Sequence, residues 1–288
     1  PSGWARADAS SLASMPLGSS HTARLAAALV ARRDLSATVR LLNAEGILPM
    51  PLKGVLLQHV VYQDPADRML SDADLLVPPG QFGRAIAALR RAGHRIAPEG
   101  RAGASTKGPD AQLEVDVHRR PFSPGLFALR GEALFARGRI DEALFDGVVV
   151  LPDPRDLYAH LVGNFAKGRH VAQDAAQLRD FSAVASRFGL APAELARHLE
   201  AHGLARAARY ALAHATDDAF AARVLEALAA DPVGDATAAL ARRLTAPFGS
   251  SALVCAAAPH LVDRSLPRGV LSAGAHAALG VRARLARR

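Results

Sequence analysis

The sequence predicts an α+β fold, with a small mixed β-sheet domain and flanking helices followed by an α-helical domain. Between residues 47 and 121, short apolar stretches alternate with acidic residues, and a period of two is typical of β-strands. After residue 148 the chain is rich in alanine, leucine and arginine, which favour helices. Glycine or proline separates one helical stretch from the next, as expected for a bundle of short helices.

A chain of 288 residues is long enough for one large domain or two smaller ones. We expect a disordered segment at 1–20, a sheet domain at 21–122, a connection at 123–147, a helical domain at 148–281 and a basic tail at 282–288. The tail carries four arginines, and we interpret it as a solvated, frayed end.

The composition limits the partners that this protein can have. The net charge is +8, but it comes almost entirely from arginines spread over the predicted helices, without the single stripe and interleaved aromatics of a nucleic-acid surface. Nucleic acid is therefore an unexpected partner. No apolar run approaches the length that spans a membrane, and residues 1–20 lack the pattern of a signal peptide. The single cysteine, Cys255, excludes an internal disulfide and a cysteine-rich metal site. These features predict a cytoplasmic protein without membrane contact.

The predicted sheet domain begins with a helix from about His21 to Glu45, capped by Ser19 or Ser20 and ended by Gly46. A short apolar segment with two prolines, 47–52, is typical of an edge strand. The remaining elements follow in order: a helix at 54–62, a strand at 71–77, a helix at 81–92, a strand at 94–97, a mobile glycine-rich loop at 98–109 and a strand at 112–118.

In the second half of the chain, a short strand at 147–151 precedes a series of helices. Their predicted ranges are 155–167, 172–188, 192–202, 203–214, 217–229 and 235–245. His160, Asn164, Lys167 and His170 recur at helical spacing within and just after the first of them, and we interpret them as a polar helix surface.

Acidic residues gather on two of the predicted strands. Asp72 and Asp74 are two positions apart and therefore face the same side of one strand. On the other strand, Glu114, Asp116 and His118 share one face, opposite an apolar face that can be buried. Crowded carboxylates repel one another unless a cation lies between them, and Mg²⁺ binds one or two carboxylates together with substrate phosphates. This pattern predicts metal-dependent phosphoryl or nucleotidyl transfer.

A longer series of motifs carries a family resemblance. In order, these are Leu52-Lys53-Gly54, Tyr62 with Asp64-Pro65, Arg68, Ser71-Asp72-Ala73-Asp74-Leu75-Leu76-Val77 and Val115-Asp116-Val117-His118. Together they resemble the uncharacterised nucleotidyltransferase-like family of the DNA polymerase β-type nucleotidyltransferase superfamily. The resemblance covers residues 41–121 and continues through 157–161 and 178–180.

The resemblance implies a nucleotidyltransferase-type sheet domain in which Asp72, Asp74 and Asp116 are the catalytic metal ligands for two Mg²⁺ ions. Asp72 and Asp74 would hold the metals against the nucleotide phosphates. Asp116 would bind the metal nearer the acceptor and take the proton from the acceptor hydroxyl. Glu114 is a reserve ligand in this interpretation, with a solvated surface carboxylate as the alternative.

Four further residues are candidates for nucleotide binding. Lys53 and Gly54 stand where a strand turns into a helix, although the superfamily usually has Gly-Ser there. Arg68 is either a second phosphate ligand or a surface arginine. His118 either assists proton transfer or is a structural histidine beside the site. Lys107, in the predicted loop, closes over the nucleotide or plays no part.

These residues predict a magnesium-dependent nucleotidyltransferase. It would transfer a nucleoside monophosphate from a nucleoside triphosphate (NTP), with ATP as the expected donor. The acceptor would be a hydroxyl of a small molecule or of a peptide or protein, bound by the helical domain. Two alternatives remain open at this point: an inactive scaffold that binds a partner through its helical domain, and an RNA-modifying nucleotidyltransferase supported only by the net charge of +8. A phosphate-binding regulatory module without transfer is a third.

Overall fold

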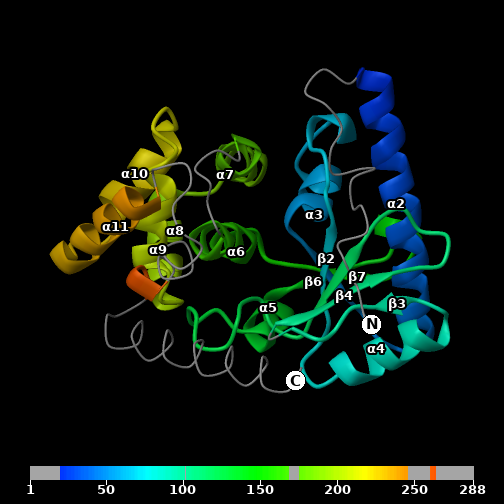
Figure 1. Cartoon of the computed structure of the whole chain (residues 1–288). Coiled ribbons are helices and arrows are strands. Elements are labelled where there is room, and N and C mark those ends of the chain that lie inside the picture. Colours follow the sequence, from blue (N-terminus) through cyan, green and yellow to red (C-terminus); the bar gives the residue numbers. More distant parts are fainter. Residues whose placement is uncertain (1–19, 101, 169–174, 246–259, 264–288) are drawn as a thin grey trace. The chain divides into compact units, whose positions relative to one another are not determined.

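A computed structural model describes residues 20–100, 102–168, 175–245 and 260–263. The predicted tail at 282–288, Cys255, His170 and all of the segment 1–20 except Ser20 lie outside the described residues. The chain divides into two compact units. The sheet unit comprises 1–121 and 130–153, and the helical unit comprises 122–129 and 154–288 (Figure 1). The predicted connection, 123–147, is therefore shared between the two units. The predicted combination of a mixed sheet with a helical part is confirmed.

The sheet unit contains a five-stranded mixed sheet with the order β1-β2-β5-β4-β3. Its strands are β1 (Met50–Leu52), β2 (Ala73–Leu76), β3 (Arg95–Ile96), β4 (Gly103–Lys107) and β5 (Val115–His118). The central pair, β2 and β5, is parallel, and the other neighbours are antiparallel. A second sheet pairs β6 (Arg139–Asp141) with β7 (Val149–Leu151), and Val150 N donates to Pro49 O at 3.0 Å beside β1.

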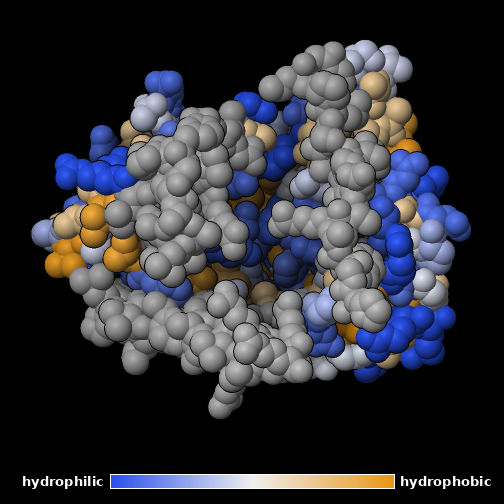
Figure 2. All heavy atoms as spheres, in the orientation of Figure 1, coloured by the Kyte–Doolittle hydropathy of each residue, from blue (hydrophilic) through white to orange (hydrophobic). Residues whose placement is uncertain are grey.

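Four α-helices and two 3₁₀ turns complete the described part of this unit. They are α2 (His21–Ala44), α3 (Lys53–Val60), α4 (Phe82–Arg91), α5 (Gly131–Arg137), η1 (Pro65–Asp67) and η2 (Leu144–Asp146). Ser20 caps α2 by accepting a hydrogen bond from Ala23 N, as predicted. Helix α3 contacts β1 and β2, and α4 contacts β3 and β5. The outward surface over α4 is largely hydrophilic (Figure 2), since Arg84, Arg90 and Arg91 are exposed there. The surface over α2 is mixed, because Leu29 is exposed as well as Arg33 and Arg40.

The prediction of a mobile loop at 98–109 is wrong, because residues 103–107 form β4. Burial alternates along this strand: Ala104 and Thr106 are buried and their neighbours are half-exposed. This alternation gives no hydrophobic signal in the sequence, because the buried face of β4 consists of small or polar side chains. Lys107 therefore lies on a strand, paired with Arg95 of β3.

His59 couples the packing of the sheet unit to pH. Its ring lies edge-on to Phe145, with centroids 5.1 Å apart. Burial, and then the positive charge of Arg32, lower the pKa of His59 from 6.5 to about 4. The unfolded chain therefore takes up a proton between pH 6.5 and pH 4 that the folded chain does not bind. The contribution of neutral His59 to the unfolding free energy is fully present above pH 6.5 and is lost as the pH falls toward 4.

We expect His59→Gln to flatten this dependence. Between pH 7 and pH 5 the wild type should lose up to about 2 kcal/mol more unfolding free energy than the variant, measured by urea denaturation. His94 and His214 also have lowered pKa values, so the difference between the two proteins, rather than the wild-type curve, is the quantity to compare. Parallel curves for wild type and variant would contradict the prediction.

The described helices of the second unit are short and pack on one another. They are α6 (Pro154–Lys167), α7 (Ala175–Phe188), α8 (Pro192–Ala201), α9 (Ala205–Leu212), α10 (Ala219–Ala227) and α11 (Pro232–Thr245). Tyr158 and Phe181 are fully buried at its centre, with ring centroids 5.6 Å apart. Among the described helices, none is long and apolar enough to cross a membrane.

The predicted polar surface on 155–167 is wrong for His160. This side chain is 1% exposed and its ring stacks on Phe122, with centroids 5.2 Å apart. Gly163, on the same helix, leaves room for the Phe122 ring, because a Cβ there would clash with Phe122 Cζ. The segment 122–129 is thus packed against α6 rather than forming a free linker.

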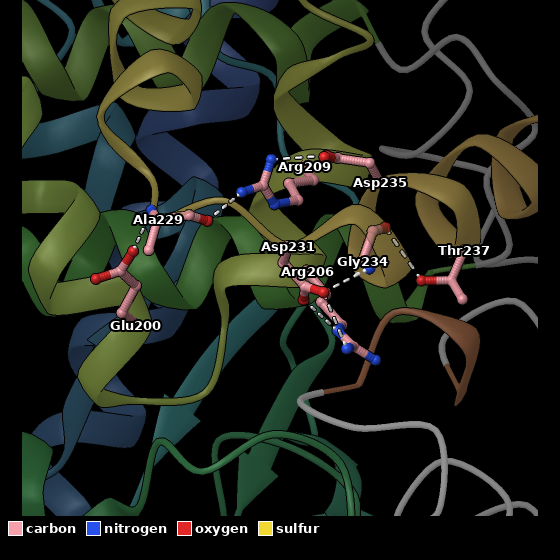
Figure 3. Close-up of polar contacts among 8 residues, drawn as sticks. All are labelled: Glu200, Arg206, Arg209, Ala229, Asp231, Gly234, Asp235 and Thr237. Atoms are coloured by element: carbon pink, nitrogen blue, oxygen red, sulfur yellow. Dashed lines mark hydrogen bonds and ion pairs between the residues drawn. The ribbon is translucent and has the colours of Figure 1, made fainter.

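Two arginines of α9 hold the connection between α10 and α11 (Figure 3). Arg206 Nε donates to Asp231 Oδ2 at 2.7 Å, and Asp231 Oδ1 accepts from Gly234 N at 2.8 Å. Arg209 donates to Asp235 Oδ1 at 2.6 Å and to the carbonyl oxygen of Ala229 at 2.5 Å. The hydrogen bond from Arg206 lowers the pKa of Asp231 despite partial burial. Ion pairs and side-chain to backbone hydrogen bonds thus fix this connection.

Candidate active site

The parallel pairing of β2 with β5 brings the acidic residues together. Asp74 lies directly opposite Asp116 in this register, and Leu76 lies opposite His118. On β5, Val115 and Val117 are buried whereas Asp116 and His118 are half-exposed, which confirms the predicted division of faces. Asp72 lies one residue before β2, at the entrance to the strand rather than within it.

Asp74 is the most buried member of the group, with 3% of its surface exposed. Its Oδ1 accepts from Lys53 Nζ at 2.5 Å and from His118 Nε2 at 2.7 Å. Burial by itself would raise the pKa of Asp74. The charge of Lys53 and the hydrogen bond from His118 outweigh this effect, and the pKa lies well below its ordinary value. Asp74 is therefore a carboxylate with a fixed orientation and a fixed charge.

Asp72 and Asp116 add negative charge on the same side. The pKa of Asp72 is raised, first by burial and then by the charge of Asp74, with a smaller contribution from Asp116. Ser71 Oγ donates to Asp72 Oδ1 at 2.8 Å. One ligand atom from each of Asp74, Asp116 and His118 lies within 4.8 Å of the other two. Two carboxylates and one imidazole at this spacing could hold a divalent cation, and Asp72, one residue before β2, is not a member of this group.

The reserve ligand, Glu114, is occupied by a neighbour. Ser105 Oγ of β4 donates a short hydrogen bond to Glu114 Oε1. Ser105 itself lies opposite Asp116 in the β4–β5 register. This bond draws the Glu114 carboxylate toward β4, whereas Asp74 is on the β2 side of β5. Glu114 is thus hydrogen-bonded to β4, whereas Asp116 lies opposite Asp74 of β2, a difference that the sequence did not reveal.

Lys53, Gly54 and Arg68 meet at the N-terminus of α3. Lys53 is the first residue of the helix and has a backbone φ of 54°, in the left-handed region that non-glycine residues rarely adopt. A Cβ on Gly54 would lie 2.9 Å from Leu70 Cδ2 and 3.6 Å from the guanidinium carbon of Arg68. Two cationic side chains and a helix N-terminus are thereby placed together, an arrangement that favours phosphate.

A buried glutamine fixes the backbone that carries Arg68. Gln58 is 1% exposed, and its Nε2 donates to the carbonyl oxygens of Pro65 at 3.0 Å and Arg68 at 2.8 Å. The Arg68 side chain donates to Met69 O at 2.9 Å. Sequence reasoning missed Gln58, because a lone glutamine in a predicted helix gives no signal of the turn that it binds.

Gly103 is a second position that sequence reasoning missed. It pairs with His118 across the β4–β5 ladder. A Cβ there would collide with the carbonyl oxygen of Val117 and would lie 2.9 Å from the Cα of His118. Backbone atoms cannot move aside as a flexible side chain can, so only glycine permits the close approach of β4 that supports His118.

The family assignment follows from the sequence as a whole. The profile of a family described as uncharacterised nucleotidyltransferases matches residues 12–217. The chain belongs to this family. Membership confirms the predicted enzyme class, nucleotidyltransferase, and the match extends beyond the sheet unit into the first helices of the helical unit. No curated protein matches the chain.

Several solved structures of nucleotidyltransferases are similar to this nucleotidyltransferase-family protein. The solution structure of the antibiotic-resistance factor ANT(2'')-Ia is 13% identical, with a TM-score of 0.43, and the match covers 63% of this chain and 91% of that one. The crystal structure of ANT(2'')-Ia with adenylyl-2''-tobramycin is also 13% identical, with a TM-score of 0.43 and coverages of 58% and 92%. An antigenic nucleotidyltransferase-like protein from Paracoccidioides brasiliensis is 13% identical, with a TM-score of 0.38 and coverages of 54% and 75%. The family assignment rests on the sequence profile rather than on these structures.

Proposed function

We propose that this protein is a magnesium-dependent nucleotidyltransferase. It transfers a nucleoside monophosphate from an NTP, with ATP as the preferred donor, to a hydroxyl group of a small-molecule or peptide/protein acceptor, and it releases pyrophosphate. The main support is the parallel pairing of β2 with β5, which sets Asp74 opposite Asp116, with Asp72 one residue before β2. Membership in a nucleotidyltransferase family supports the same reaction class.

The side chains of the site fit the cation that this reaction requires. Carboxylate oxygens are the protein ligands that Mg²⁺ prefers. Asp74 and Asp116 supply them from adjacent strands, and Asp72 would add a third from the residue before β2. When bound, two Mg²⁺ ions would neutralise phosphate charge and stabilise the attacking and leaving oxygens. His118 keeps its hydrogen bond to Asp74 in this assignment and orients that carboxylate. Lys53 and Arg68 would bind the β- and γ-phosphates.

The reaction is an in-line displacement at the α-phosphorus. A lone pair of the acceptor hydroxyl oxygen forms the new bond to phosphorus while the bond to the oxygen that bridges to the β-phosphorus breaks. Pyrophosphate leaves with that electron pair, and the hydroxyl proton passes to Asp116 and then to water. Lys53 and Arg68 balance the charge of the departing pyrophosphate.

A binding experiment tests this assignment with a control on the same sheet. Calorimetric titration of α,β-methylene analogues of ATP, GTP, CTP and UTP should show magnesium-dependent binding to the wild type, tightest for the ATP analogue. Asp72→Asn should weaken that binding by about 10-fold or more, because a metal ligand is lost. Glu114→Gln is the matched control, since it removes a carboxylate that is bound to Ser105, and its affinity should stay within about 2-fold of the wild type.

Two outcomes would contradict the assignment. Loss of binding in Glu114→Gln but not in Asp72→Asn would place the cation elsewhere on the sheet. The absence of magnesium-dependent binding to folded wild type would favour a scaffold that has kept the fold without the chemistry.

A further inference from the structure

A group of metal-binding side chains in the helical unit takes no part in the proposed transfer. Asp156 lies in the first turn of α6 and is completely buried. His198 lies in the last turn of α8, and His202 follows as its C-cap. One ligand atom from each of these three residues lies within 4.8 Å of the other two. Among the described residues, this and the Asp74, Asp116 and His118 group are the two clusters with such spacing.

The two histidines are four residues apart, so their rings lie on the same side of α8. Their ring centroids are 4.6 Å apart in an edge-to-face arrangement. The helix end that carries them is fixed by its backbone. His202 N donates to His198 O at 3.2 Å, and His202 O accepts from Ala128 N at 3.1 Å. The rings are therefore presented by a defined helix terminus and not by a free loop.

The carboxylate of Asp156 supplies the third ligand. His198 Nε2 donates to Asp156 Oδ1 at 2.8 Å. In a tetrahedral zinc site with ligands at about 2.1 Å, ligand atoms lie about 3.4 Å from one another. A metal ion can thus replace the proton shared by His198 and Asp156 if their separation opens by roughly 0.6 Å, a shift within the range of small side-chain rotations. The positive charge of a metal ion would also offset the free-energy cost of burying the Asp156 carboxylate completely.

We propose that Asp156, His198 and His202 form a binding site for a zinc-type divalent transition metal, which ties the start of α6 to the end of α8. Two imidazoles with one carboxylate favour Zn²⁺ over Mg²⁺, which prefers oxygen ligands alone. Three protein ligands leave a fourth position for water or an added ligand. This site has two imidazoles and one carboxylate, whereas the cluster on β2 and β5 has two carboxylates and one imidazole. The proposal does not depend on the proposed transferase function.

Metal binding by the full chain tests the proposal. After treatment with EDTA and dialysis, titration with ZnSO₄ should show a site with a Kd on the order of 1 μM or tighter, weakening below pH 6 as the histidines take up protons. His202→Gln should weaken this site by about 100-fold. His214→Gln, on a half-buried histidine of the same unit, and His118→Gln, in the other cluster, should leave the zinc affinity of this site unchanged.

Cobalt gives a second measurement that does not depend on a variant folding. Co²⁺ bound to the wild type should give the intense visible absorption of a tetrahedral site, and His118→Gln should keep it. A weak octahedral spectrum, no zinc binding at 10-fold excess over the protein, or binding that is equally strong in folded His202→Gln would each overturn the proposal. In that case the three residues are an ion pair with a neighbouring ring and nothing more.

Discussion

Asp74→Asn is expected to reduce nucleotidyl transfer by about 1,000-fold or more, because it removes charge at the centre of the site. Asp74 is the residue through which Lys53, His118 and the opposing Asp116 are connected. Asparagine keeps the size and one acceptor oxygen, so the strand should remain intact. Its neutral amide cannot hold a divalent cation as a carboxylate does.

The measurement is magnesium-dependent release of labelled pyrophosphate from γ-labelled ATP, with water as the substitute acceptor. Asp110→Asn is the matched control, since Asp110 is an exposed aspartate of the same unit, and its rate should equal that of the wild type. Thermal melting of each variant separates loss of chemistry from loss of fold. A rate for Asp74→Asn within 10-fold of the wild type would show that Asp74 does not bind the metal.

Lys53→Met is expected to lower the unfolding free energy by about 2 kcal/mol, the second large effect. The variant leaves the Asp74 carboxylate buried without the ammonium group of Lys53, while His118 Nε2 still donates to it at 2.7 Å. Lys53→Gly also removes the ammonium group, but it relieves the left-handed backbone at this position, where φ is 54°. The glycine variant should therefore be more stable than the methionine variant by about 1 kcal/mol.

Urea denaturation of the two variants and the wild type measures both differences. Lys107→Met is the control for loss of a lysine from the same unit, and it should change stability by less than about 0.5 kcal/mol. Equal stabilities of Lys53→Met and Lys53→Gly would show that the backbone of Lys53 is not strained. If Lys53→Met is as stable as the wild type, the ion pair between Lys53 and Asp74 makes no net contribution to the unfolding free energy.

These two predictions depend on contacts that the sequence did not reveal. The motif Leu52-Lys53-Gly54 indicated a turn before a helix, and Lys53 was interpreted as a phosphate ligand. The ion pair between Lys53 and Asp74 joins residues 21 positions apart, and the pairing of strands decides it. Propensity and periodicity describe neighbours along the chain, so they give no information about such a contact.

The sequence by itself determined which residues of β5 face which side of the sheet, because that depends only on the local period of two. It also determined the order of helices in the second half of the chain, and the family, through motifs that lie close together in the sequence. Only the tertiary structure decided that β2 and β5 are parallel neighbours, that Ser105 binds Glu114, and that Asp156 meets His198. These are contacts between distant segments, and their formation depends on how whole strands and helices pack rather than on any local preference.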